Sequence, residues 1–263
     1  MVKRIKKKEK AGDFIKFLGT AGARFVMIKQ LRASGGIWVT YKGTNVLIDP
    51  GPGSLVRCAA SRPKLDPTGL DAIILTHRHL DHSGDINVMI EAMTEGGFKK
   101  KGVVFCTADA IGEDAVILRH TRSFPKNLEV IHANTSYKAG EFEFLTSMKH
   151  IHPVETYGLK FNIAGTTISL LTDTKYFKEL NDFYKGSDIL IIAVVLYEPR
   201  PGIEHLSLYD VEQIVTQLRP SRTILTHFGM TMVKAKPHLK AQELSSRIGL
   251  QVEAAYDGMA IDF

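Results

Sequence analysis

The segment LTHRHLDHSGD, residues 75–85, constrains this chain more than any other stretch. It places three histidines and two aspartates within eleven positions, directly after the apolar run DAIIL, which is typical of a buried strand. Because His77 and His79 are two residues apart, both side chains project to the same side of an extended segment. Asp81 and His82 follow at a bend and can turn towards a second point nearby. A solvated polar loop explains each side chain alone but not all four together, so the pattern predicts two adjacent metal sites.

The residue types indicate which metals fit. Imidazole and carboxylate groups suit zinc, and also manganese or iron, and they make thiolate ligands unnecessary. Cys58 and Cys106 are too few for a disulfide framework and lie in unrelated surroundings. We therefore expect two free buried thiols that take no part in metal binding.

The composition predicts a soluble globular protein. The chain has 263 residues, 44% hydrophobic and 24% charged, which is enough for a sizeable core. Its longest apolar run, ILIIAVVLY at 189–197, is about half of what a membrane-spanning helix needs, and no apolar stretch of signal-peptide type follows the N-terminus. We expect a cytoplasmic protein with no membrane partner and one domain over residues 1–263.

Charge is concentrated at the beginning of the chain. The net charge is +6, and the first ten residues hold six lysines and arginines against one acid, Glu9. A basic end of this kind is more often solvated than bound to nucleic acid. Residues 1–12 are therefore interpreted as a basic N-terminal tail.

The alternation of apolar and polar residues predicts many strands and two clear helices. A first series of strands, expected to be antiparallel, comprises 14–20, 24–31, 36–43 and 44–50. A second series comprises 71–75, 102–108, 128–133, 141–151, 157–165, 166–174, 188–197, 223–228 and 252–263. Helices are expected at 83–93, with Ser83 as N-cap, and at 207–219, with Ser207 as N-cap and Asp210 in the first turn. This order favours two sheets packed face to face with helices outside.

The histidine segment resembles a known signature. THRHLDHSGD is similar to the T-x-H-x-H-x-D-H-x-G motif of the metallo-β-lactamase-fold hydrolases. LIDPG around Asp49, SMKHIHPVETYG, LLTDT and ILTHFG resemble the other motifs of this family, in the expected order. The resemblance implies an α/β fold, the four-layer αββα sandwich of two mixed sheets flanked by helices, with a two-metal site at one edge.

The resemblance also implies a ligand set. It assigns His77, His79 and His152 to one metal ion, Asp81, His82 and His227 to the second, and Asp173 to both. His150 shares a strand face with His152, so periodicity does not separate the two, but the spacing of HPVETYG resembles the phosphodiesterase branch and favours His152. Asp49 is either a turn former or a residue that orients ligands through hydrogen bonds.

The implied chemistry is hydrolysis. Two divalent ions, zinc or else manganese or iron, would share a water, and the hydroxide between them would attack the substrate, with Asp81 counted among the catalytic groups. A leaving alkoxide needs a proton, and His205 is the candidate donor. His205, Leu206 and Ser207 resemble the HST motif of ribonuclease Z and related phosphodiesterases, with leucine at the second position.

Several features point to one branch of the family. FLGTAG at 17–22 and LRASGG at 31–36 resemble the ribonuclease Z and cyclic-phosphate phosphodiesterase branch, in which glycines let the backbone approach an anion. Only twenty residues separate His152 from Asp173, which leaves no room for the RNA-binding arm of ribonuclease Z. The prediction is a phosphodiesterase for a small or cyclic phosphodiester.

Other functions stay open at this point. They are hydrolysis of a lactone or thioester, ribonuclease Z-like RNA processing, and a metal-binding scaffold without turnover. We expect a small anionic substrate rather than nucleic acid, and a homodimer.

Overall fold

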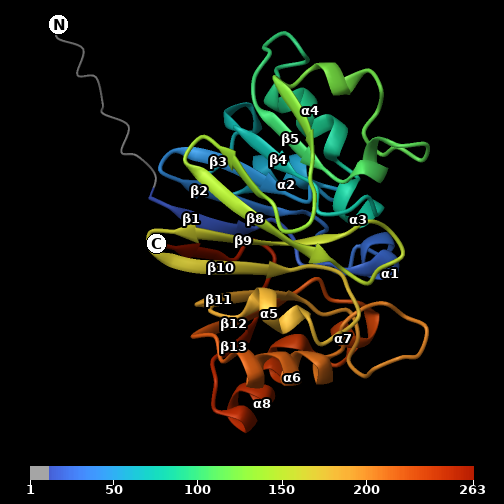
Figure 1. Cartoon of the computed structure of the whole chain (residues 1–263), viewed down its shortest axis with the longest axis vertical. Coiled ribbons are helices and arrows are strands. Elements are labelled where there is room, and N and C mark those ends of the chain that lie inside the picture. Colours follow the sequence, from blue (N-terminus) through green and yellow to red (C-terminus); the bar gives the residue numbers. More distant parts are fainter. Residues whose placement is uncertain (1–11) are drawn as a thin grey trace, which may run out of the picture.

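The computed structural model describes residues 12–263, and within them two seven-stranded sheets pack face to face (Figure 1). The first sheet contains, in spatial order, β14 (Ala260–Asp262), β1 (Phe14–Phe17), β2 (Ile37–Tyr41), β3 (Thr44–Ile48), β4 (Ala72–Ile74), β5 (Val103–Cys106) and β6 (Asn127–Val130). Strands β14 to β3 are antiparallel neighbours, and β3 to β6 are parallel.

The second sheet repeats this mixed arrangement. It contains, in spatial order, β13 (Val252–Ala254), β12 (Arg222–Thr226), β11 (Ile189–Ala193), β10 (Thr166–Leu171), β9 (Tyr157–Ile163), β8 (Phe142–Lys149) and β7 (Ser136–Ala139). Strands β13 to β10 are parallel, and β10 to β7 are antiparallel. The predicted pair of mixed sheets is confirmed.

Helices cover the outer face of each sheet (Figure 1). In chain order they are α1 (Ala23–Ile28), α2 (Ser54–Ala60), α3 (Leu80–Ser83), α4 (Ile86–Met93), α5 (Leu180–Tyr184), α6 (Leu208–Leu218), α7 (Met230–Lys234) and α8 (Pro237–Ile248). Short 3-10 turns lie at η1 (Pro67–Gly69), η2 (Ala108–Ile111) and η3 (Thr121–Ser123). Helices α2 and α4 pack on the first sheet, and α5, α6 and α8 pack on the second. The predicted αββα layering is therefore confirmed.

The central strands are apolar because both of their faces are buried. In β3, Val46 and Ile48 enter the core between the sheets, whereas Leu47 enters the core beneath α2 and α4. A strand buried on both sides reads as a continuous apolar run rather than as an alternating one. Three apolar cores, one between the sheets and one on each outer face, thus hold the strands in place. The loops at one edge therefore start from rigid strand ends.

Helix α6 begins where the sequence predicts. Ser207 accepts a hydrogen bond from the backbone N–H of Asp210, and the Asp210 carboxylate accepts one from the backbone N–H of Ser207, which together form a capping box. Leu208, Val211 and Val215 lie on the buried face of the helix. The predicted cap is confirmed, and it fixes the end of the loop that carries His205.

The predicted strand at 24–31 is wrong. Its first residues form α1, which lies outside both sheets and buries only Val26. The segment is rich in aromatic and branched side chains, but packing against neighbours decides strand formation more than composition does. Ala21 forms an isolated bridge with Phe228, and the chain turns into the helix directly afterwards.

Two further predictions of local structure are wrong. Residues 252–263 form two strands in different sheets, because Gly258, at φ +88°, lies in a turn that carries the chain from one sheet to the other. Ser83 is the last residue of α3 rather than an N-cap, and Asp85 precedes α4. The Ser83 hydroxyl instead donates a hydrogen bond to the backbone carbonyl of Arg78.

Both cysteines are free and buried, as predicted. Burial raises the pKa of the Cys58 thiol and of the Cys106 thiol to about 12, so neither forms a thiolate near neutral pH. Within residues 12–263, no helix combines the length and the apolar character needed to cross a membrane.

We expect Ser207→Ala to lower the free energy of unfolding by about 1 kcal/mol, because the first turn of α6 loses its side-chain acceptor. Urea denaturation followed by circular dichroism measures the change. Ser136→Ala, at an exposed position of β7, serves as the control and should stay within about 0.5 kcal/mol of the wild type. Equal effects of the two substitutions would contradict a stabilising role of the cap.

Candidate metal centre

The site lies at one edge of the sandwich, where strands of both sheets end. His77 and His79 follow β4, Asp81 and His82 lie in α3, and the remaining histidines and Asp173 follow strands of the second sheet. Because parallel strands end at the same edge of a sheet, the fold brings together residues that are far apart in the sequence. The structure places all seven predicted ligand residues in this cluster.

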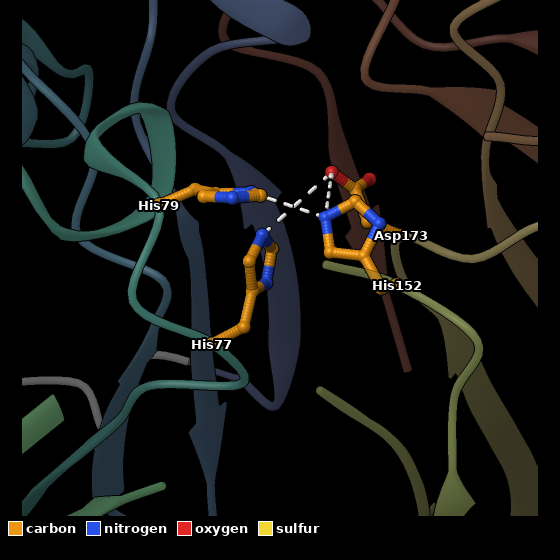
Figure 2. A group of neighbouring side chains, drawn as sticks. All are labelled: His77, His79, His152 and Asp173. Atoms are coloured by element: carbon orange, nitrogen blue, oxygen red, sulfur yellow. Dashed lines mark hydrogen bonds and ion pairs between the residues drawn. The ribbon is translucent and has the colours of Figure 1, made fainter. Parts of the chain in front are cut away.

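One group of side chains comprises His77, His79, His152 and Asp173, which point towards one another (Figure 2). His152 Nε2 lies 3.0 Å from His79 Nδ1 and 3.9 Å from Asp173 Oδ2. His77 Nε2 lies 3.7 Å from the same carboxylate oxygen. Three ring nitrogens and one carboxylate thus converge on a single point from both sheets.

A second group comprises Asp81, His82 and His227. His82 Nε2 lies 2.8 Å from His227 Nε2, which lies 3.3 Å from Asp81 Oδ2. Asp173 borders this group as well, because its Oδ2 is 3.6 Å from His82 Nε2 and its Oδ1 is 3.3 Å from His227 Nδ1. Asp173 therefore lies between the two groups.

The donor set fits two divalent cations. Ring nitrogens face one another in two pairs, His152 with His79 and His82 with His227, and each pair contains lone pairs that a shared cation would satisfy. Within residues 12–263, His77 Nε2, Asp173 Oδ1 and His227 Nδ1 are buried and have no hydrogen-bond partner. Buried polar atoms without partners are rare, and here they are directed into one cluster.

The electrostatics prepare the side chains to donate electron pairs. Burial lowers the pKa of His77 well below its ordinary value, and burial together with His152 lowers the pKa of His79 to about 4, so both rings are neutral. Burial alone would raise the pKa of Asp173, but the neighbouring His227 and His205 outweigh it and the pKa is lowered. For His82, the carboxylates of Asp81 and Asp49 outweigh burial and raise the pKa. The carboxylates are ionised, and His82 would release a proton on binding a cation.

Asp49 holds the first ligand segment in place. Its carboxylate accepts hydrogen bonds from the Thr76 backbone N–H and hydroxyl, each at 2.7 Å, and lies 3.0 Å from His82 Nδ1. Asp49 and His227 both have a positive φ, +51° and +57°, which costs a residue other than glycine about 1 to 3 kcal/mol. Asp49 thus both turns the chain and orients His82, so the two interpretations of the sequence hold together.

His150 lies outside the cluster. Its Nδ1–H donates to the backbone carbonyl of Asp173 at 3.1 Å, and its Nε2 accepts from the Tyr184 hydroxyl at 3.0 Å. Both ring nitrogens are used, whereas the Nε2 of His152 faces His79. The geometry separates two histidines that periodicity does not.

His205 lies at the border of the cluster. Its Nδ1 is 3.6 Å from Asp173 Oδ2, and its ring centre is 5.0 Å from that of His152. The side chain is 18% exposed, whereas that of Asp173 is 2% exposed. Burial lowers the pKa of His205, so its imidazole is largely neutral near pH 7 and carries one N–H.

Two contacts of the site were not predicted. The His152 Nδ1–H donates to the backbone carbonyl of Glu204 at 3.0 Å, which leaves the Nε2 lone pair free. A backbone acceptor has no signal in the sequence. Gly22 lies against His227 so closely that a Cβ would collide with the His227 carbonyl, so this glycine accommodates the chain itself rather than an anion.

Comparisons with known proteins agree with this geometry. The family model described as "Beta-lactamase superfamily domain" matches residues 44–228, and the chain belongs to this family. "Uncharacterized protein MJ1374" from Methanocaldococcus jannaschii is 27% identical, over 94% of this chain and 93% of that protein. The crystal structure of the metallo-β-lactamase-fold protein YhfI from Bacillus subtilis has a TM-score of 0.78 at 21% identity, over 96% of this chain and 100% of that chain.

A diphosphatase from the PhnP family has a TM-score of 0.70 at 22% identity, over 96% of this chain and 98% of that chain. The two structural likenesses show that the chain has the metallo-β-lactamase fold. The assignment of individual side chains as metal ligands remains a prediction.

We expect His77→Ala and Asp81→Ala each to lose at least one bound ion, because each removes a donor that no other side chain replaces. Mass spectrometry of metal content after dialysis measures the loss. His238→Ala, at an exposed position of α8, is the matched control and should keep the wild-type content. Wild-type occupancy in both ligand variants would refute the assignment.

We expect Asp49→Asn to weaken metal affinity by about 10- to 100-fold without abolishing binding, because the amide cannot accept all three hydrogen bonds that orient Thr76 and His82. Competition with a chromogenic chelator measures the affinity. Asp262→Asn, exposed on β14, provides the comparison. Unchanged affinity in Asp49→Asn would mean that Asp49 acts only as a turn former.

Proposed function

We propose that this protein is a dinuclear metal-dependent hydrolase that cleaves a small or cyclic phosphodiester. One observation carries the proposal: seven imidazole and carboxylate side chains from both sheets converge on one edge of the sandwich, with a further histidine on the rim. A site that only stabilised the fold would be closed by its ligands, whereas a catalytic site keeps a position open.

The proposed ligand roles follow the two groups. His77, His79 and His152 would hold one ion, and Asp81, His82 and His227 would hold the other, with Asp173 contacting both. Two divalent ions bound there would lower the pKa of a shared water and stabilise negative charge on a phosphoryl oxygen. Four or more nitrogen donors favour zinc, and the carboxylates also suit manganese or iron.

His205 is proposed as the group that serves the leaving oxygen. It lies between β11 and α6, and the capping box of Ser207 and Asp210 fixes the end of its loop. Its side chain is 18% exposed while its buried Nδ1 lies 3.6 Å from the Asp173 carboxylate, so the ring borders the cluster on the side where substrate would enter. A neutral histidine in this position can donate a hydrogen bond to an alkoxide that leaves phosphorus, and its protonated form can supply a proton.

Two structural features favour a small phosphodiester over the alternatives. The segment between His152 and Asp173 is filled by a short loop and by β9 and β10, so it provides no arm for gripping RNA. After His227 the chain forms α7, α8, β13 and β14, and the two strands rejoin the sheets, so residues 228–263 form no separate helical substrate domain. The structural likeness to a diphosphatase of the PhnP family also supports a substrate that contains a phosphate ester or anhydride.

The scaffold hypothesis is less well supported. A scaffold without turnover has no need to keep a complete ligand set, and here all seven positions are filled. It also has no need for a partly exposed His205 side chain whose buried Nδ1 lies unpartnered beside the cluster.

We expect the metal-loaded protein to hydrolyse bis(p-nitrophenyl) phosphate, and His205→Ala to lower kcat by about 10²- to 10⁴-fold on a cyclic phosphodiester, whose leaving group is an alkoxide, while metal content stays unchanged. Absorbance of p-nitrophenolate measures turnover, and His238→Ala is again the control. Preferential turnover of a lactone or thioester would overturn the substrate class, and cleavage of precursor transfer RNA alone would favour RNA processing. Bound metal with no turnover on any of these substrates would favour the scaffold.

A further inference from the structure

We propose that Arg78, Asp109 and Glu155 form a clasp between the two sheets that sets the distance between His79 and His152, so that these three are positioning residues for one metal ion. The proposal rests on the metal centre of the proposed function. None of the three residues belongs to the ligand set, and each belongs to a different loop at the site edge of the sandwich.

Asp109 and Glu155 join the sheets by reciprocal hydrogen bonds. Asp109 Oδ2 accepts from the Glu155 backbone N–H at 3.1 Å, and Glu155 Oε2 accepts from the Ala108 backbone N–H at 3.0 Å. Asp109 follows β5 of the first sheet, whereas Glu155 lies between β8 and β9 of the second. The hydroxyl of the buried Tyr157 donates to Glu155 Oε1 at 2.7 Å and fixes the carboxylate. Each loop thus supplies both a side chain and a backbone group to the other.

Arg78 ties the first ligand loop to this junction. Its Nε donates to Asp109 Oδ2 at 3.1 Å, and its backbone carbonyl accepts from the Ser83 hydroxyl at 3.1 Å. Arg78 stands between His77 and His79 in the chain, so anchoring its side chain and its backbone restricts rotation of both neighbours. The Arg78 and Asp109 side chains are each 29% exposed. Water screens such a pair, so we assign it geometric control rather than a large contribution to stability.

The clasp ends beside the metal centre on the second sheet as well. His152 precedes Glu155 by three residues, and its Nε2 lies 3.0 Å from His79 Nδ1. These two imidazoles come from different sheets, and the hydrogen bonds of Arg78, Asp109 and Glu155 connect the loops that carry them. Loosening the clasp would let the two loops separate, which would lower the affinity for the ion shared by His79 and His152. Within residues 12–263, no hydrogen bond or ion pair joins the side chains of Asp81, His82 and His227 to the clasp, so the affinity for the second ion should change less.

The test compares Asp109→Ala and Glu155→Gln with Asp114→Ala. Asp114 also contacts Arg78, at 3.6 Å, but it is 80% exposed and does not join the β8–β9 loop, which makes it a matched control. Zinc affinities are measured by competition with a chromogenic chelator, and the visible spectrum of the cobalt-loaded protein reports ligand geometry. Thermal unfolding of the metal-free proteins checks that each variant folds.

We expect Asp109→Ala and Glu155→Gln to lower the affinity for the ion shared by His79 and His152 by about 10- to 100-fold and to change the cobalt spectrum. Asp114→Ala should have the affinity and the spectrum of the wild type. Asp109→Asn keeps one oxygen that can still accept from both Arg78 and Glu155, so it should lie between the wild type and Asp109→Ala. Glu155→Gln loses an acceptor for either the Ala108 N–H or the Tyr157 hydroxyl, because Glu155 uses both of its oxygens. Because both readouts concern metal, they remain informative if the wild type hydrolyses no phosphodiester, a result that would overturn only the proposed substrate class.

Three results would overturn the clasp. The first is wild-type affinity and spectrum in folded Asp109→Ala and Glu155→Gln. The second is an equal loss of affinity for both ions in these variants, which would indicate a general loss of structure. The third is a wild-type protein that binds no zinc, which would also overturn the metal centre.

Discussion

The buried carboxylate of Asp173 is the constraint on which the rest of the site depends. Its side chain is only 2% exposed, and an isolated charge at such a position is very costly. The protein compensates by placing imidazoles from both sheets within 3.3 to 3.9 Å of its two oxygens. His205 and His227 keep its pKa below the ordinary range although burial acts in the opposite direction. Imidazoles gathered in this way around one buried carboxylate are stable chiefly when cations complete the group.

The two mixed sheets make this concentration possible. Strand β10 ends two residues before Asp173, β4 ends shortly before His77, and β12 ends directly before His227, all at one edge of the sandwich. Each strand is buried on both faces, so its end is fixed, and the loops need to span only a few residues to reach the cluster. The left-handed backbone of His227 is the local cost of this arrangement, and the packed core beneath it holds the conformation.

The order of strand and helix patterns predicts the layers of the fold, and the resemblance of LTHRHLDHSGD and the later motifs to a known signature implies the members of the cluster. LTHRHLDHSGD carries its ligands within a few residues, and Asp173 and His227 each follow an apolar strand that is easily recognised. The errors occur where distant contacts decide the structure. Residues 24–31 have the composition of a strand but meet no partner strand, and residues 252–263 divide because the chain crosses from one sheet to the other.

Contacts between distant loops were beyond the reach of sequence patterns for the same reason. His150 and His152 are equivalent by periodicity, and only the position of Tyr184 behind one of them separates their environments. Asp109 and Glu155 look like ordinary loop acids in the sequence, because their partners are backbone N–H groups and an arginine that lie elsewhere in the chain.

The histidine side chains of the site differ in their exposure to solvent. His77 is completely buried and His152 is 1% exposed at its side chain, whereas His205 reaches 18%. A purely structural centre does not need both buried donors, such as His77 and His152, and a partly exposed histidine with an unpartnered ring nitrogen, such as His205. The loop before α6 supplies both His205 and the Glu204 carbonyl that orients His152. A movement of this loop would therefore affect the exposed histidine and the buried one together. In the proposed function, a substrate that contacts His205 would contact the same loop that orients His152.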